Sequence, residues 1–375
     1  MDQSVLDEVA RDLALRAAEH DRDGSFPFEG FDLLRAAGLL KLTVPVELGG
    51  DGAGLVDVSR AVGTIAQGDP SVALVFSMQC IGHAGISRLG RWPRHMYEMI
   101  ARDAVENGGI INSLRVEPEL GTPARGGLPT TTAVPVPGGY RLSGHKIYTT
   151  GIPVLRWLNV WGRTPEDDPL VGNFLVRSDS PGIQVIETWD HMGMRATASH
   201  DVVFKDVFVP ADHAVDICHP KDRPPQDATG AAWNALIIGS LYDGVARAAR
   251  NWLIWYLKDR KPTNLGASLA TLPRFQSAVG EIDGMLTASR RLIESVARET
   301  DAGTPPSFAE CNLVKREITN NAIQSVELGI SLIGNPGLSR KNPIERHYRD
   351  VLCSRIHTPQ DDVIVLGAGR AALGV

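Results

Sequence analysis

The strongest constraint on the fold is a change in the spacing of apolar residues along the 375-residue chain. From Val5 to Ala17, apolar residues recur every fourth position, which predicts an amphipathic helix. After Gly108, short β-rich runs separated by proline and glycine replace this helical spacing. The helical spacing returns from about Ala228. The sequence therefore predicts helices, then a small β domain, then helices again.

These changes set the predicted domain bounds at residues 1–107, 108–226 and 227–375. A stretch rich in proline and charge, His219–Asp227, marks the second boundary. The predicted fold class is α+β, with an N-terminal helical domain, a middle antiparallel β domain and a C-terminal four-helix-bundle domain.

Composition narrows the class of protein. Hydrophobic residues make up 43% and charged residues 22%, which is typical of a soluble globular enzyme, and the net charge of −6 provides no basic surface for nucleic acid. The N-terminus has no apolar segment of a signal peptide, and no run approaches the ~20 apolar residues of a membrane span. The cysteines are far apart and predict neither disulfides nor a metal site. We expect a cytoplasmic protein without membrane or nucleic-acid partners.

One stretch near the C-terminus, Pro343–Asp362, combines charge and constraint. Its sequence is PIERHYRDVLCSRIHTPQDD, in which Glu345 and Arg349 are four residues apart and can form an ion pair on a helix. Pro359 lacks an N–H group and disfavours helix at the preceding residue. The pattern predicts a charged helix that leads into a constrained turn. A solvated helix followed by an ordinary loop would fit the same spacing.

The run PIERHYRD resembles the P-x-E-R-x-x-R-D run of the acyl-CoA dehydrogenase family, and the predicted domain order matches that family over essentially the whole chain. In the family, the turn after this helix supplies the catalytic carboxylate. The resemblance implies FAD as cofactor, an acyl-CoA as small-molecule substrate and a homotetramer. It also implies a redox partner, which would be an electron-transfer flavoprotein or a flavin reductase.

Two runs in the β domain resemble flavin-contacting segments of the family. The run LSGHKIYTTGIP resembles G-x-K-x-W-I-T-N-G, which implies that Tyr148 packs on the flavin and that Thr150 bonds flavin N5. A threonine-rich strand edge is the alternative interpretation. The run WDHMGMRATAS resembles the G-M-R-x-T segment, so Arg195 is either a cofactor contact or a structural ion-pair residue.

Three further runs resemble cofactor and substrate motifs. Arg260 and Gln276 match residues that bind the ADP part of FAD, partly across a subunit interface. Gly334 belongs to a run, ISLIGNPGL, that resembles the family's Q-x-x-G-G-x-G. Thr122 lies in a run that resembles T-E-P-x-x-G-S, where the family contacts the pantetheine arm of CoA.

The catalytic base is the unresolved part of the prediction. Thr358 stands where the family turn has glutamate, and Asn234 stands where one branch of the family carries it instead. Asp361 or Asp362, just past the turn, could serve as the base of a dehydrogenase. His357 could transfer protons near neutral pH, although a half-buried ring bonded to a backbone carbonyl is the ordinary alternative.

The sequence thus predicts an FAD-dependent, acyl-CoA dehydrogenase-like oxidoreductase that performs α,β-dehydrogenation of an acyl thioester with hydride transfer to flavin N5. The alternative is a reduced-flavin-dependent monooxygenase on the same fold, which needs no base for an α-proton. Some of those enzymes carry histidine at two positions that align with Gln79 and Gln360. A non-catalytic or stress-related flavoprotein is the third hypothesis.

Overall fold

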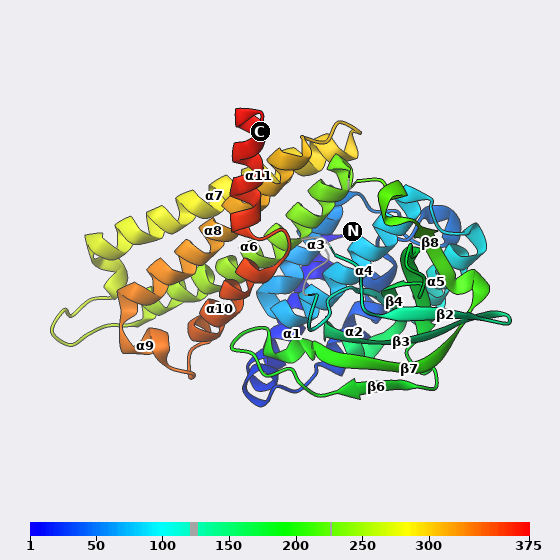
Figure 1. Cartoon of the computed structure of the whole chain (residues 1–375). Coiled ribbons are helices and arrows are strands. Elements are labelled where there is room, and N and C mark those ends of the chain that lie inside the picture. The colour runs from blue at the N-terminus through cyan, green and yellow to red at the C-terminus, as the bar shows by residue number, and fades with distance from the viewer. Residues whose placement is uncertain (121–126, 226) are drawn as a thin grey trace.

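The computed structural model describes residues 1–120, 127–225 and 227–375, and it confirms the predicted fold class. N-terminal helices and a β-sheet lie at one end of the molecule, and long C-terminal helices extend to the other (Figure 1). Because α5 ends at Asn107 and α6 begins at Ala228, we retain the domain bounds given above as a proposal.

The N-terminal part consists mainly of five α-helices: α1 (Gln3–Asp23), α2 (Phe28–Ala36), α3 (Leu55–Gly68), α4 (Pro70–Leu89) and α5 (Arg94–Asn107). Local sequence fixes where α4 begins. The Asp69 carboxylate accepts hydrogen bonds from the backbone N–H groups of Ser71 and Val72, at 2.8 and 3.2 Å. Proline at the first helical position needs no such partner, so the start of α4 is strongly specified.

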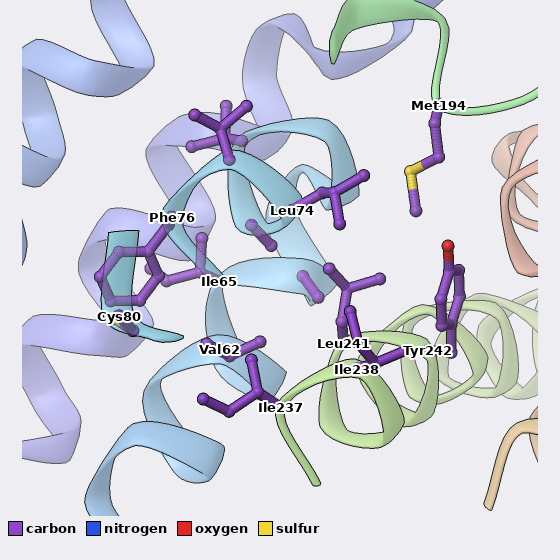
Figure 2. Packing of buried hydrophobic residues seen from close by; sticks show 14 of the residues in the cluster. Val62, Ile65, Leu74, Phe76, Cys80, Met194, Ile237, Ile238, Leu241 and Tyr242 are labelled. Atoms are coloured by element: carbon purple, nitrogen blue, oxygen red, sulfur yellow. The ribbon is translucent and has the colours of Figure 1, made fainter. Parts of the chain in front are cut away.

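Among the described residues, α4 is the one helix long and apolar enough to cross a membrane. Half of its apolar window is buried inside the protein, however. Its residues Leu74, Phe76 and Cys80 belong to the same core cluster as Val62 of α3 and Ile237 of α6 (Figure 2). Because helices enclose α4 on several sides, its apolar composition is that of a core helix in a soluble fold.

The middle part is an eight-stranded, mostly antiparallel sheet in the order β6-β7-β3-β2-β4-β5-β8, with β1 paired in parallel to β4. The strands are β1 (Ile110–Leu114), β2 (Thr132–Val136), β3 (Gly139–Thr149), β4 (Leu155–Arg163), β5 (Val171–Arg177), β6 (Ile183–Ile186), β7 (His200–Pro210) and β8 (Ala214–Cys218). The end of β3 carries the predicted flavin-contacting residues, so the sheet positions one side of the candidate site.

A buried ion pair between Glu117 and Lys146 joins two segments that are 29 residues apart in the sequence. The Glu117 carboxylate accepts from Lys146 Nζ at 2.6 Å and from the N–H and hydroxyl groups of Thr130 and Thr131 at 2.6 to 3.0 Å. Burial alone would raise the pKa of Glu117, but these hydrogen bonds outweigh it and lower the pKa to about 2. The pair fixes β3 against the segment that leads toward the predicted substrate residue Thr122, which itself lies outside the described residues.

The C-terminal part is helical: α6 (Ala228–Asp259), α7 (Pro273–Asp301), α8 (Phe308–Ile333), α9 (Asn335–Leu338), α10 (Pro343–Leu352) and α11 (Asp361–Leu373). Helix α6 packs against α7, α8 and α10, and also against α3. The α3–α6 approach requires glycine, because a Cβ at Gly244 would lie 2.3 Å from the Gly63 carbonyl oxygen. Helix α11 stands out from the body (Figure 1).

Candidate active site between the β domain and the helical bundle

The charged helix predicted from the sequence is α10, and its charges tie the parts of the molecule together. Arg349 forms two hydrogen bonds with Glu345, at 2.8 and 3.1 Å, which confirms the predicted i,i+4 pair. The same guanidinium binds both carboxylate oxygens of Asp21 in α1, at 2.9 and 2.6 Å, and donates to the Met192 carbonyl at 2.7 Å. Helix α10 is thereby fixed to α1 and to the segment before β7.

The next residue, Asp350, also holds α10 against the segment before β7, through a buried hydrogen bond. Its carboxylate is buried and accepts a 2.7 Å hydrogen bond from the backbone N–H of Met194. The backbones of α10 and of the segment before β7 approach so closely that a Cβ at Gly193 would lie 2.3 Å from the Arg349 carbonyl oxygen. Burial raises the pKa of Asp350 to about 7, against the opposing charge of Arg346.

The turn at residues 357–359 is fixed through its backbone carbonyls. Lys315 in α8 donates to the carbonyls of His357 and Pro359, both at 2.6 Å. The side-chain amide of Asn234 in α6 donates to the carbonyl of Thr358 between them, at 3.0 Å. Lys315 is itself buried, and burial lowers its pKa to about 8. The turn thus has a fixed backbone, and the two positions that the sequence resemblance predicted for a base, 234 and 358, lie side by side.

The side chain of His357 is half-buried and points to another residue of α6. Its Nε2 lies 2.7 Å from the hydroxyl oxygen of Tyr242, which is completely buried. The ring therefore pairs with a tyrosine hydroxyl, and not with the backbone carbonyl considered from the sequence. Burial, assisted by the charge of Lys315, lowers the pKa of His357 to about 4, so the ring is neutral at pH 7.

The two aspartates after the turn lie in the first turn of α11, where a negative charge favours the helix. The Asp361 carboxylate accepts from the Asn320 amide at 3.2 Å and lies 3.7 Å from Arg316, both in α8. Asp362 is exposed. The Asp361 carboxylate is therefore engaged on α8 and is not part of the Tyr242–His357 contact.

The opposite side of the site is the end of β3. Thr150 Oγ1 accepts a 3.0 Å hydrogen bond from the hydroxyl of Ser199, which lies 2.8 Å from the hydroxyl of Thr197. Since Ser199 uses its proton on Thr150, Thr150 keeps its own proton for a further acceptor. Among the described residues, no acceptor for that proton is present. This hydroxyl can therefore donate to a ligand.

Tyr148 is the exposed aromatic residue of this wall. Its backbone has a positive φ of 57°, and 54% of the residue is exposed. The ring meets Trp189 and His191 edge-on, with centroids 6.4 and 6.1 Å away, and those two rings stack at 3.7 Å. An exposed aromatic surface beside a free hydroxyl donor fits a planar heterocycle with a hydrogen-bond acceptor, as a flavin has.

Met194 joins the two walls. Its carbonyl accepts from Trp189 Nε1 at 3.0 Å, and its N–H donates to Asp350. The methyl end of its side chain points toward the Tyr242 hydroxyl (Figure 2). Met194 thus links Trp189, whose ring meets Tyr148, with Asp350 of α10 and with the surroundings of the Tyr242–His357 contact.

Arg195 has a structural role in this junction. Its Nε donates to the Asp21 carbonyl at 2.7 Å, and its terminal nitrogen donates to the His191 carbonyl at 3.0 Å. These bonds tie the end of α1 to the segment before β7. The cofactor contact considered for Arg195 stays a prediction.

The other cofactor residues lie elsewhere. Arg260 ends α6, Gln276 lies in the first turn of α7, and Gly334 follows α8, at the end of the bundle far from the sheet (Figure 1). The Gln276 amide donates to the Ala270 carbonyl at 3.0 Å, and a Cβ at Gly334 would meet no atom within 4 Å. Within one subunit these residues are separate from Tyr148 and Thr150.

Comparison with known proteins identifies the family. Models of the N-terminal, middle and C-terminal domains of acyl-CoA dehydrogenase match residues 1–91, 116–207 and 236–361. The putative acyl-CoA dehydrogenase YdbM of Bacillus subtilis (strain 168) is 32% identical, over 96% of this chain and 93% of the relative. The chain belongs to the acyl-CoA dehydrogenase family. This is a flavin-dependent family of oxidoreductases.

Two further similarities are to proteins that are not named as acyl-CoA dehydrogenases. The L-evernosamine nitrososynthase of a Micromonospora strain is 28% identical, over 92% of this chain and 83% of the relative. The structure of KijD3 with FMN and dTDP-3-amino-2,3,6-trideoxy-4-keto-3-methyl-D-glucose is 30% identical with a TM-score of 0.86, covering 99% of this chain and 93% of that one. The family likeness therefore extends both to a putative dehydrogenase and to a nitrososynthase.

Proposed function

We propose that the protein is a reduced-flavin-dependent monooxygenase of the acyl-CoA dehydrogenase family. The observation that carries this proposal is the hydrogen bond between Asn234 and the Thr358 carbonyl. The two positions predicted for the base from the family resemblance meet there, and they hold an amide and a hydroxyl. Neither group takes up a proton near neutral pH, so an α-proton has no general base at these positions.

The contacts of Asp361, the other candidate for the base, support the same conclusion. Asp361 is hydrogen-bonded to Asn320 and lies close to Arg316 on α8, where a carboxylate is stabilised in place. A monooxygenase needs no such base. Its substrate gains one oxygen atom from O₂, the other oxygen leaves as water, and the bound reduced flavin supplies the two electrons. The nitrososynthase relative, which by its name makes a nitroso group, is in line with this chemistry.

The chain's own groups fit a flavin at the junction. Thr150 has a hydroxyl proton to donate to a ring acceptor, and Tyr148 offers an exposed aromatic surface beside it. The pair of Tyr242 and His357 joins α6 to the turn after α10, and Met194 lies between this pair and the residues around Tyr148. We propose FAD as the cofactor, with the electrons delivered through a flavin reductase in the cytoplasm.

The second candidate is the α,β-dehydrogenation of an acyl-CoA, with hydride transfer to flavin N5 and an electron-transfer flavoprotein as acceptor. The 32% identity to a putative acyl-CoA dehydrogenase over almost the whole chain favours it. In this case Asp361 or Asp362 would have to act as the base, and Thr122 would contact the pantetheine arm. Asp361 would have to leave its contacts with α8.

We also propose a homotetramer. Helix α11 leaves Val363, Val365, Leu366 and Leu373 between 42% and 79% exposed, which is costly for an isolated subunit. The separation of Arg260 and Gln276 from Tyr148 supports the same assembly. In a tetramer, the distant bundle end of one subunit can reach the ADP part of FAD held by another.

One experiment separates the candidates. Flavin-loaded protein is mixed anaerobically with a panel of acyl-CoAs, and flavin absorbance is followed. In a second arm, a flavin reductase and NADH supply reduced flavin in air, with primary amines, amino-sugar nucleotides, phenols and thioethers as test substrates. We expect no bleaching by acyl-CoA and an oxygenated product in the second arm. Bleaching by any acyl-CoA would instead establish the dehydrogenase.

A further inference from the structure

The contact between Tyr242 and His357 determines which ring nitrogen of His357 carries the proton. Tyr242 is completely buried, and among the described residues its hydroxyl forms one hydrogen bond, 2.7 Å long, to Nε2 of His357. If Nε2 were the donor, the tyrosine proton would be buried without an acceptor, which is energetically unfavourable. The methyl end of Met194, which accepts no hydrogen bond, faces the same hydroxyl (Figure 2). The hydroxyl therefore donates to Nε2.

This assignment fixes the tautomer. A neutral imidazole carries one proton, so the proton of His357 must be on Nδ1. The low pKa of about 4 keeps the ring neutral at pH 7. Nδ1 of His357 has no hydrogen-bond partner among the described residues and is not among the fully buried atoms that lack one, unlike Nδ1 of His347 and both ring nitrogens of His83. His357 thus has one N–H group on its open side.

The direction of that N–H group is fixed as well. Lys315 holds the backbone carbonyl of His357, and Tyr242 holds the far side of the ring. Neighbouring Thr358 is held by Asn234. A donor that is fixed before the reaction can stabilise developing charge without reorganisation of its surroundings.

We propose that His357 is a catalytic residue that donates an Nδ1–H hydrogen bond to the oxygen atom that gains negative charge in the reaction, and that Tyr242 is the positioning residue that sets its tautomer. The inference rests on the proposed function, because it places reacting oxygen on the open side of His357. In the absence of a substrate, reduced flavin and O₂ give oxidised flavin and H₂O₂, so this step needs no further reactant.

The tautomer is tested without any reaction. Full-length, flavin-loaded protein labelled with ¹⁵N-histidine is measured by NMR, and the His357 signals among the ten histidines are assigned by their loss in His357→Asn. We expect the proton on Nδ1 and a lone pair on Nε2 in the wild type. In Tyr242→Phe we expect a mixture of both tautomers. A proton on Nε2 in the wild type would overturn the inference, whatever the activity of the protein.

The donor role is tested by the rate at which O₂ reoxidises protein-bound reduced FAD in stopped-flow mixing. The side-chain amide of asparagine takes a position near Nδ1, and that of glutamine near Nε2. We therefore expect His357→Asn to keep most of the rate, while His357→Gln and Tyr242→Phe lose about tenfold, as for one neutral hydrogen bond. Equal rates in all three variants would overturn the donor role. Normal NMR results without an oxygenated product would count against the proposed function alone.

Discussion

The side-chain amide of Asn234 in α6 donates a 3.0 Å hydrogen bond to the backbone carbonyl of Thr358, 124 residues further along the chain. The contact joins the two sequence positions that the family resemblance predicted for a catalytic base. The carbonyls on either side of it are held by one buried lysine, Lys315. The backbone of the turn is thus kept in one position by a neutral donor and a cationic donor.

A carboxylate placed at position 358 tests the dehydrogenase candidate directly. We expect that Thr358→Glu, alone or with Pro359→Gly, gives no bleaching of the flavin by short or medium acyl-CoAs in anaerobic stopped-flow measurements. The reason is that the proposed substrate is not a CoA thioester. The double variant matters because proline restricts the direction of the new side chain.

If the new carboxylate did act as a base, the rate of flavin bleaching by an acyl-CoA would rise by a large and easily measured factor. A working general base accelerates proton transfer by roughly 100- to 10,000-fold. If either variant gains acyl-CoA-dependent bleaching on that scale, a CoA site is present and the dehydrogenase candidate becomes the better one. If the wild type already bleaches, Asp361→Asn and Asp362→Asn identify which aspartate acts as its base.

Thr150 provides a test of the flavin position. Thr150→Ala should weaken flavin binding by about 1 kcal/mol, the contribution of one neutral hydrogen bond, because the proton left by the Ser199–Thr150 bond is lost. The affinity is measured by quenching of flavin fluorescence during titration. Thr150→Ser is the matched control, and it should keep near wild-type affinity. If alanine and serine variants bind equally well, the hydroxyl does not contact the flavin.

The sequence predicted the order of helices and strands because apolar spacing is a local property that changes at residues 108 and 228. It also predicted the Glu345–Arg349 pair, since four residues of helix bring those side chains together. The partners of the turn could not be predicted in this way. Tyr242 reaches His357 across 115 residues, and Lys315 reaches the His357 carbonyl across 42.

Local patterns also left the role of single polar residues open. A tyrosine within the largely buried helix α6, such as Tyr242, has the same sequence signal whether it fills the core or positions a histidine. Arg195 matches a flavin-lining motif, and within the subunit it donates to the backbone carbonyls of residues 21 and 191 and pairs with the Asp190 carboxylate at 3.4 Å. The role of such a residue depends on how separate segments of the chain pack together. The spacing of residues along the chain carries no information about that packing.

The raised pKa of Asp350 predicts an unusual dependence of folding stability on pH. Burial raises its pKa to about 7, so between about pH 4 and pH 7 the folded protein holds a proton that the unfolded chain has lost. The stability that this proton contributes is present below about pH 4 and is lost as the pH rises toward 7. In Asp350→Asn the amide oxygen can still accept from Met194 N–H, but the titration is absent.

We therefore expect the stability of the wild type, relative to Asp350→Asn, to fall with rising pH by up to about 1.4 kcal/mol per pH unit within this window. Urea unfolding at several pH values between 4.5 and 7.5 measures the difference. Asp362→Asn, which removes an exposed carboxylate, is the control and should show little slope. A constant difference between wild type and Asp350→Asn would mean that the Asp350 carboxyl titrates normally.

A substitution of Arg260 tests whether the cofactor is FAD or FMN. It lies at the exposed end of α6, far from the end of β3, and in the proposed tetramer it would contact the ADP part of an FAD held by a neighbouring subunit. We expect Arg260→Ala to weaken FAD binding by about 2 kcal/mol, the scale of a charge-assisted hydrogen bond, and to leave FMN binding unchanged. Fluorescence titrations with both flavins measure this, and Lys258→Ala, two residues earlier at the same exposed helix end, should change neither affinity. Equal losses for both flavins in Arg260→Ala would point to damage to the bundle, and no loss for either would place Arg260 among the surface charges.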